Sequence, residues 1–315
     1  MHIKFISSYL PKNYRSINFL KKSLGKNYNR VLNYTGYKKI HVLKEGNSIQ
    51  QFIFNSIRNF LKSNQINAKN IDCIIYSSHT RPSEMPNFSI SIQKKFNLRN
   101  EILAYDLPNS CSAFTNGLIH SHAMLKSAVV KNVLLICSDF HSTKLNKKNK
   151  NLVPVIGDGI SCIYIKKDEK NLIKFDFGVE GNENSILKIE NESLSMDGIK
   201  VFEFAVDKVP KTVARILTKA KNLKKKIDFV VLHQPNKNIF ENLIKKLSID
   251  NKKFISNYNH GNLSAASIPV NICKNFPNKI IRNKTFLFVG FGSGLSWSSI
   301  IMKLNRTKVE KIIYL

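Results

Sequence analysis

The amino-acid sequence predicts an α/β protein built from two copies of one unit. Short runs of β-branched and apolar residues alternate with segments whose apolar residues recur at helical spacing. Each half of the chain runs helix, strand, helix, strand and closes on a glycine turn flanked by apolar strands, at residues 157–159 and at residues 292–294. This alternation favours mostly parallel sheets that are covered by helices on both faces. The boundary between the halves is expected near residues 167–171.

Strands in the first half are predicted where apolar, β-branched residues run together between turn residues. These runs are residues 3–7, 73–77, 102–107, 133–137 and 155–166, the last being a pair of strands broken by a Gly-Asp-Gly turn. Helices are predicted at residues 53–61 and 112–126, from apolar side chains at helical spacing. The second of these helices is apolar or small on all sides, which indicates a buried helix at the centre of the protein.

The second half repeats this order of elements. Long amphipathic stripes predict helices at residues 201–220 and 239–247. Apolar runs predict strands at residues 229–232, 285–290 and 296–304.

The chain is strongly basic, with 50 Lys and Arg residues against 21 Asp and Glu residues and a formal net charge of +29. Lys, Asn and Ile are all abundant, a bias that an AT-rich coding sequence produces anywhere in a protein. The dense basic runs at 144–150 and 221–226 lie between structured segments, as solvated loops or helix ends do. Neither run is interleaved with aromatic residues, and no nucleic-acid-binding motif occurs. Compositional bias and an acidic partner therefore explain the charge better than nucleic acid does.

The five cysteines are scattered, odd in number and without a C-x-x-C pair, which excludes a disulfide scaffold and a zinc ribbon. The first residues show no apolar stretch followed by a small-residue cleavage site, and no run reaches the ~18–20 apolar residues of a membrane helix. We therefore expect a reduced, cytoplasmic protein that neither inserts into a membrane nor binds a metal or cofactor.

Cys111 is the candidate nucleophile. It follows an apolar strand and a Pro-Asn-Ser turn, and it opens the buried helix. The partial positive charge and free N–H groups of a helix N-terminus lower the pKa of a thiol and favour the nucleophilic thiolate. The same N–H groups can hold the oxyanion that forms when a thioester is attacked. The other four cysteines lie in or beside apolar runs and are interpreted as core residues.

A cysteine nucleophile needs polar partners within reach. His233 follows the strand 229–232, and sites in α/β sheets gather at the carboxyl ends of strands. Asn262 lies in a polar turn that leads into small helix residues. Each signal is weak on its own, because a single histidine or a turn asparagine is usually structural.

Taken together, these segments resemble the β-ketoacyl-acyl-carrier-protein synthase III family of thiolase-fold condensing enzymes, over about residues 1–304. The matching segments are Asn109-Ser-Cys-Ser-Ala-Phe, Gly157-Asp-Gly, Met196-Asp-Gly-Ile-Lys-Val-Phe, His233-Gln-Pro-Asn, Gly261-Asn-Leu-Ser-Ala-Ala-Ser and Phe291-Gly-Ser-Gly-Leu-Ser-Trp. The resemblance implies a thiolase-like duplicated α/β unit, with two mixed sheets in a layered α/β/α/β/α arrangement. The halves would be residues 1–168 and 169–304, and residues 305–315 extend past the family's usual end.

The resemblance also implies catalytic roles. Cys111 would accept an acyl group as a thioester, from acyl-coenzyme A or an acyl-carrier protein. His233 and Asn262 would hold the thioester carbonyl of malonyl-acyl-carrier protein and stabilise the enolate as CO₂ leaves. An amide at position 262 can donate to that enolate, whereas a carboxylate would repel it. The backbone N–H of Gly294 would complete an oxyanion hole with that of Cys111.

Two residues are assigned to the acyl pocket by the resemblance. Ile156 stands just before the Gly-Asp-Gly turn, where relatives often have a bulky aromatic residue. Met85, in the segment 80–87, would lie near the partner subunit of a homodimer and form a pocket wall.

Four basic residues are assigned to the docking of coenzyme A or carrier protein. Arg30 stands where relatives that use coenzyme A often have a tryptophan. Lys237, Lys245 and Lys246 lie on the helix after His233, and they would attract a carrier protein because such proteins are strongly acidic.

Three functions remain open at this point. The first is decarboxylative condensation, which the amide at Asn262 favours. The second keeps the acylated Cys111 but passes the acyl group to an alcohol or amine in a specialised pathway. The third is a non-catalytic basic protein that binds nucleic acid or a membrane surface, and the presence of Cys111, His233 and Asn262 together argues against it.

Overall fold

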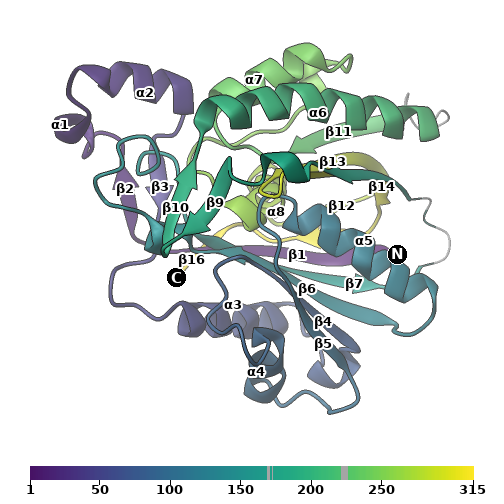
Figure 1. Ribbon diagram of the computed structural model, residues 1–315. Helices are drawn as coiled ribbons and strands as arrows, with labels where there is room; N and C mark the ends of the chain where they lie inside the picture. The colour runs from purple at the N-terminus through teal and green to yellow at the C-terminus, as the bar shows by residue number, and fades with distance from the viewer. Residues whose placement is uncertain (169–170, 172, 221–225) are drawn as a thin grey trace.

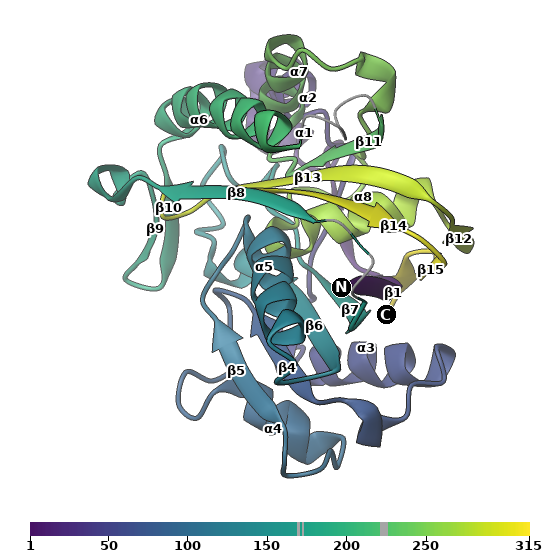
Figure 2. The same cartoon turned by 90° about the vertical axis from the view of Figure 1, so that its right-hand side faces the viewer.

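The computed structural model describes residues 1–168, 171, 173–220 and 226–315. Its principal helices have the following bounds: α3 (Ile49–Ser63), α4 (Phe88–Lys95), α5 (Ala113–Lys126), α6 (Gly198–Lys219), α7 (Lys237–Lys246) and α8 (Ser267–Asn275). Helices and sheets alternate in five layers, as Figures 1 and 2 show. α6 and α7 cover one sheet, α5 and α8 lie between the two sheets, and α3 and α4 cover the other sheet. The layered α/β/α/β/α arrangement is therefore confirmed.

The larger sheet has eight strands within the described residues. Its order is β12 (Lys279–Ile281), β15 (Thr307–Val309), β1 (His2–Leu10), β7 (Gly159–Lys166), β6 (Asn132–Asp139), β4 (Cys73–Ser77) and β5 (Leu103–Leu107), with β16 (Ile313–Tyr314) also paired to β1. β7 runs antiparallel to both of its neighbours, β1 and β6. β4 runs parallel to both of its neighbours, β6 and β5.

The smaller sheet repeats that pattern of directions. In the described part of the chain it consists of β11 (Ile227–Leu232), β13 (Lys284–Gly292), β14 (Ser296–Leu304) and β8 (Lys174–Val179). β8, β14 and β13 are antiparallel, and β13 and β11 are parallel. Both sheets are thus mixed, as the family resemblance implied, and less parallel than the alternation of helices and strands alone suggested. The boundary at residue 168 stays a prediction.

Apolar side chains fill each space between layers. Phe114 and Leu118 of α5 pack against both sheets, and α6 and α7 pack on the outer face of the smaller sheet. α3 and α4 pack on the outer face of the larger sheet. Because both faces of each sheet are covered, the strands are apolar runs without alternation, and this is why their positions can be read from the sequence.

One predicted strand is absent from the described residues. Residues 155–166 were expected to form two strands around the Gly-Asp-Gly turn, but only β7 forms, from Gly159 onward. Ile156 instead makes a single bridge to Asn262, and Gly157 N–H donates to the Asn262 carbonyl at 3.0 Å. The apolar residues here contact another loop rather than a neighbouring strand. Periodicity in the sequence cannot distinguish these two kinds of contact.

Residues 305–315, to which the sequence assigned no role, belong to the larger sheet. β15 and β16 both run parallel to β1. Beyond them, Leu315 N–H donates to the Leu10 carbonyl at 2.9 Å, and the C-terminus lies beside β16 in Figure 1.

Short elements complete the described chain around one end of the sheets. They include α1 (Lys21–Leu24) and α2 (Tyr28–Thr35), the antiparallel pair β2 (Tyr14–Ser16) and β3 (Lys39–His41), and the antiparallel pair β9 (Leu187–Glu190) and β10 (Ser193–Met196).

Parts of two sequence predictions lie outside the described residues. These are residues 221–225 of the second basic run, and residues 169, 170 and 172 beside the predicted boundary. Over the residues that are described, no helix is both long and apolar enough to cross a membrane, and no group of His, Cys, Asp or Glu side chains is arranged to hold a metal ion.

Candidate active site

Cys111 lies in the turn immediately before α5, with Ser112 as the N-cap residue. Strand β13 presses against this turn, and glycine makes the close approach possible. A β-carbon added at Gly292 would come within 2.6 Å of the Cys111 β-carbon and 2.8 Å of its sulfur. A β-carbon at Gly290 would lie 2.8 Å from the α-carbon of Ser112. The two glycines therefore fix the nucleophile between a helix start and a strand end.

The prediction that the pKa of Cys111 is lowered is wrong, because the net shift is upward. Burial raises the pKa of the Cys111 thiol above its ordinary value, and the hydrogen bond from Ser264 opposes that rise only in part. The helix start is present as predicted, but a thiolate loses hydration in this crowded turn, and the loss of hydration outweighs the favourable groups.

Asn262 is joined to Cys111 through Ser264. The side-chain oxygen of Asn262 accepts a hydrogen bond from Ser264 N–H at 3.0 Å, and Ser264 Oγ lies 3.6 Å from Cys111 Sγ. The Asn262 backbone is held at both polar groups, because its N–H donates to the Val155 carbonyl at 2.7 Å and its carbonyl accepts from Gly157. With its oxygen engaged, the amide presents its NH₂ group as a donor.

His233 follows β11 and is 1% exposed. Its backbone N–H donates to the Val289 carbonyl at 2.7 Å, and its ring meets the ring of Phe291 edge-on at 5.4 Å between centroids. Burial lowers the pKa of His233 to about 3, so the imidazole is neutral near pH 7. Its Nδ1 has no hydrogen-bond partner among the described residues. A neutral imidazole can donate one hydrogen bond to a developing oxyanion without first losing a proton.

The buried histidines predict how stability depends on pH. Burial also lowers the pKa of His260, beside Asn262 in sequence, to about 3. Between pH 6.5 and pH 3 the unfolded chain binds protons at His233 and His260 that the folded protein excludes, so stability falls as the pH falls through this window. At pH 5 each histidine lowers the free energy of unfolding by about 2 kcal/mol.

Urea unfolding at pH 7.5 and pH 5.0 measures this effect. We expect His260→Gln to reduce the difference between the two free energies of unfolding, because one of the two imidazoles whose pKa burial lowers to about 3 is gone. An unchanged difference in this variant would contradict the assignment of a buried neutral imidazole to His260.

The three residues predicted to be catalytic therefore converge. Ser264 connects Asn262 to Cys111, while Phe291 touches the His233 ring and is followed by Gly292, which faces Cys111. The Cys111 sulfur is thus connected, through Ser264 and through residues 291–292, to two neutral groups that can donate hydrogen bonds. Such a site can form a thioester and stabilise negative charge on a second carbonyl oxygen.

A cavity of about 640 Å³ leads to Asn262 from the surface. Exposed Arg30 and Lys150 and the half-exposed Tyr34 line its outer part, and Pro235 and Asn262 line its inner part. The predicted docking residue Arg30 therefore lines the same cavity as Asn262. Lys150 was not predicted as a site residue, although the basic run 144–150 pointed to it.

The three predicted docking lysines lie elsewhere on α7. Lys237 is half-buried and pairs with Glu241 at 3.7 Å, and Lys245 and Lys246 are exposed at the end of the helix. None of the three lines the cavity. Their contribution to docking stays a prediction.

The pocket residues and the second oxyanion-hole residue also stay predictions. Ile156 is buried beside Asn262 and does not line the cavity, where Val155 does. Met85 is 95% exposed in the single chain. A β-carbon at Gly294 would approach Ser296, whereas Gly292 is the glycine of this turn that faces Cys111.

Sequence reasoning missed a buried polar group beside Cys111. It consists of Asp139 at the end of β6, His141 at the start of η3 (His141–Lys144), Ser110, and Ser264 in η7 (Ser264–Ala266). The available signal was a pair of polar residues, Ser138 and Asp139, that follow an apolar strand at its carboxyl end.

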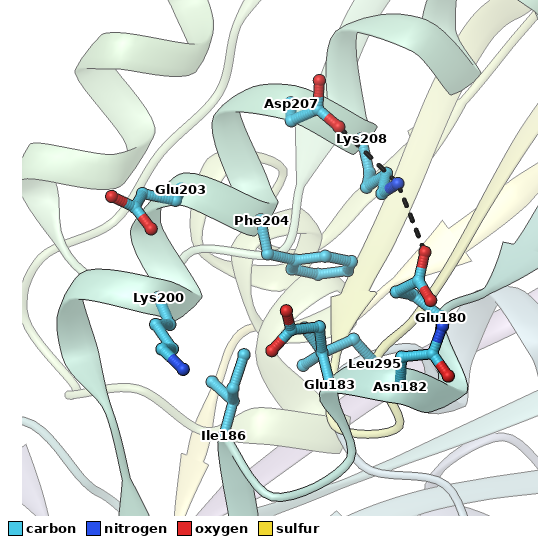
Figure 3. A pocket seen from close by; sticks show the side chains of 10 residues that line it. All are labelled: Glu180, Asn182, Glu183, Ile186, Lys200, Glu203, Phe204, Asp207, Lys208 and Leu295. Atoms are coloured by element: carbon cyan, nitrogen blue, oxygen red, sulfur yellow. Dashed lines mark ion pairs between the residues drawn. The ribbon is translucent and has the colours of Figure 1, made fainter.

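A second pocket, of about 440 Å³, is lined by none of these residues, and Figure 3 shows the side chains around it. Side chains of α6 and of the segment 180–186 face each other across it, and Lys208 pairs with Glu180 and Asp207, each at 3.6 Å. Glu183 and Glu203 add further negative charge to the lining. This lining would repel an acidic molecule, whereas Arg30 and Lys150 line the first cavity.

Comparison with known proteins agrees with this geometry. Residues 105–181 match the family model described as 3-oxoacyl-[acyl-carrier-protein (ACP)] synthase III, and residues 217–304 match that of its C-terminal part. The chain is 29% identical to a beta-ketoacyl-[acyl-carrier-protein] synthase III of Clostridium tetani, over 94% of this chain and 96% of that protein. It is also 29% identical to the synthase III of Acholeplasma laidlawii, over 96% and 98%. A crystal structure of a 3-oxoacyl-(acyl-carrier protein) synthase from Burkholderia xenovorans has the same fold, with a TM-score of 0.94 at 22% identity over 100% of this chain and 97% of that one.

Proposed function

Because the chain belongs to the 3-oxoacyl-[acyl-carrier-protein] synthase III family, we propose that it is an acyltransferase that makes a β-ketoacyl-carrier protein. It accepts an acyl group on Cys111 from an acyl thioester. It then joins that group to the two carbons that remain when malonyl-acyl-carrier protein loses CO₂.

In the first step the Cys111 sulfur attacks the carbonyl carbon of the donor thioester. The carbonyl oxygen becomes negative, and backbone N–H groups at the start of α5 are placed to stabilise it. The donor thiol then leaves with the proton that Cys111 has lost, and the acyl group remains on Cys111 as a new thioester.

In the second step malonyl-acyl-carrier protein occupies the cavity that ends at Asn262. Loss of CO₂ leaves an enolate, whose oxygen accepts hydrogen bonds from the Asn262 NH₂ group and from the His233 imidazole. The enolate carbon attacks the acyl carbon on Cys111, a carbon–carbon bond forms, and the Cys111 thiolate leaves and regains a proton. Because the enolate oxygen is negatively charged, both donors bind it more strongly than they bind the neutral ground-state carbonyl.

One observation carries this proposal: Ser264 bonds to the side chains of both the nucleophile Cys111 and the amide donor Asn262. In the proposed reaction the acyl acceptor and the enolate-stabilising group are therefore connected through one serine, and Asn262 also lines the cavity. Transfer of the acyl group to an alcohol or amine would need the first group but would leave Asn262 without a function.

Intact mass spectrometry tests the acylation step. The protein is incubated with acyl-coenzyme A or acyl-carrier protein donors of several chain lengths, and the mass increase is located by peptide mapping. We expect one acyl group, on Cys111. No adduct with any donor would refute both condensation and acyl transfer to another nucleophile.

We also propose that an acidic carrier protein enters past Arg30 and Lys150 and that the enzyme is a cytoplasmic homodimer. Charge supports the first part, because Arg30 and Lys150 lie at the outer part of the cavity in a protein of net charge +29. Exposure of Met85 supports the second, because a partner subunit would cover this large apolar side chain.

Charge reversal at the cavity tests the docking surface. We expect Arg30→Glu and Lys150→Glu together to raise KM for malonyl-carrier protein about tenfold or more, with a smaller change in kcat, because repulsion weakens encounter. Lys200→Glu, in the acidic pocket, is the matched control and should leave KM unchanged. Equal KM values for the double variant and the wild type would show that the carrier enters elsewhere, for instance along Lys245 and Lys246.

A further inference from the structure

A buried carboxylate, Asp139, organises the polar group behind Cys111. It is fully buried and accepts several hydrogen bonds at its two oxygens. The donors are Ser78 Oγ (3.2 Å), His79 N–H (3.0 Å), Thr80 Oγ (3.4 Å), Ser110 Oγ (3.0 Å) and Ala265 N–H (3.2 Å). His141 Nε2 lies 3.4 Å from the same carboxylate. A buried carboxylate with this many hydrogen bonds can hold a neighbouring cation in place.

Two serine hydroxyls connect this ion pair to the nucleophile. Ser110 Oγ lies 3.1 Å from His141 Nε2, and it also makes a short hydrogen bond to Ser264 Oγ. Ser264 Oγ in turn lies 3.6 Å from Cys111 Sγ. The result is an unbroken path from His141 through Ser110 and Ser264 to the sulfur of Cys111, and each of the first three side chains is at most 6% exposed.

The backbone at Ser264 is unusual and supports a functional reading. Its φ of 47° lies in the left-handed region, which is uncommon for a residue other than glycine. Strained conformations of this kind are retained when the surrounding structure or the function requires them. Here Ser264 N–H donates to the Asn262 side chain, while the Ser264 hydroxyl contacts the Cys111 sulfur.

The charges around the path favour a protonated His141. Burial alone would lower the pKa of His141, but Asp139 outweighs burial and the pKa is raised above its ordinary value. Burial alone would raise the pKa of Asp139, but the charge of His141 and the hydrogen bonds outweigh it and the pKa is lowered. The other titratable or charged groups that face His141, Asp139 or their neighbours are Cys111, Cys137, Tyr76, Asp158, His79, Arg81, His233 and Arg15.

We propose that Ser110 and Ser264 connect His141 to Cys111 by a chain of hydrogen bonds, that the Ser264 hydroxyl donates to the sulfur while His141 offsets the charge of Asp139, and that this arrangement stabilises the Cys111 thiolate. In this state His141 Nε2–H donates to Ser110, the Ser110 hydroxyl donates to Ser264, and the Ser264 hydroxyl donates to the sulfur. When Cys111 is protonated, Ser110 can turn its proton to Asp139 instead. Ser264 touches the reacting sulfur, whereas His141 and Ser110 are positioning residues. The proposal rests on the proposed function, because it takes Cys111 as the nucleophile.

The hydrogen-bonded path opposes the effect of burial on Cys111. Burial raises the pKa of Cys111, and the neutral His233 on the other side offers no positive charge against this effect. The hydrogen bond from Ser264 lowers the pKa of Cys111 and so opposes burial, and His141 opposes Asp139, whose charge raises that pKa. His233 is thereby left neutral for the enolate, and thiolate formation is assigned to a separate group.

Alkylation of Cys111 by iodoacetamide between pH 6 and pH 10 tests the role of the hydrogen-bonded path, with the modified residue identified by mass spectrometry. We expect Ser264→Ala and His141→Leu each to shift the midpoint of the rate profile upward by about one pH unit, which makes alkylation at pH 7 about tenfold slower. Ser112→Ala is the matched control, because the Ser112 hydroxyl neighbours Cys111 but bonds to Ser296 and Asn116. Its profile should equal that of the wild type.

A wild-type profile in Ser264→Ala would overturn this role of the path, and so would a wild-type profile in folded His141→Leu. If His141→Leu fails to fold because Asp139 is left unpaired, Ser264→Ala decides the question, since it keeps the ion pair. Alkylation needs no acyl donor. A shifted profile in a protein that forms no acyl adduct would therefore refute the proposed function and leave the role of the path standing.

Discussion

Asn262→Asp is expected to form the acyl adduct on Cys111 at the wild-type rate but to condense it about 10²–10³-fold more slowly. A carboxylate at this position cannot donate to the enolate, and its charge repels the enolate oxygen. The substitution keeps the side-chain oxygen that accepts from Ser264 N–H, so the local fold is retained. The two steps of the reaction are thereby separated in one variant.

Single-turnover measurements of acylation and of CO₂ release check this expectation. Asn259→Asp is the control. It also replaces an amide by a carboxylate, in the same loop but at an exposed position outside the cavity. Condensation at the wild-type rate in Asn262→Asp would show that residue 262 does not face the enolate.

Cys111→Ala is expected to abolish the acyl adduct and condensation altogether. No other described cysteine can replace it, because Cys73, Cys137, Cys162 and Cys273 are buried away from the surface. Burial also raises the pKa of each of these thiols, which keeps them protonated and unreactive.

The adduct is measured by intact mass after incubation with the donor that acylates the wild type. Cys273→Ala is the control and should still carry one acyl group, since Cys273 lies in the core on α8. An acyl group that remains in Cys111→Ala would place the nucleophile on another residue.

Strands and long helices could be predicted because burial on both faces imposes a clear pattern. The runs at β4, β6 and β13 are apolar without alternation, and α6 carries an apolar stripe over its whole length. These signals are local, so one sequence is enough to read them.

The missed features all depend on contacts between distant segments. Residues 155–158 are apolar and glycine-rich like a strand pair, but they bind the loop of Asn262, more than 100 positions later, instead of forming a strand. Residues 305–315 have no strong pattern, and they become strands only because β1 offers a free edge. Periodicity carries no information on either contact.

The candidate site also contains some residues that the sequence suggested and others that it did not. Local context and the family resemblance pointed to Cys111, His233 and Asn262 as candidates, and the structure connects them through Ser264 and Phe291, while their catalytic roles stay predictions. The partnership of Asp139 and His141 could not be predicted, because their function depends on Ser110 and Ser264 from two other segments. Burial of Cys111 also reversed the expected direction of its pKa shift, since the crowding by β13 is a tertiary effect.

The most direct test of the proposed function follows one acyl group through one turnover. Wild-type protein is first acylated with a labelled donor and freed of excess donor, and malonyl-acyl-carrier protein is then added. The predicted result is release of one CO₂ for each acyl group that leaves Cys111, with the label recovered in a β-ketoacyl-carrier protein. An acyl group that stays on Cys111 with no CO₂ released, or that passes only to an alcohol or amine, would contradict it.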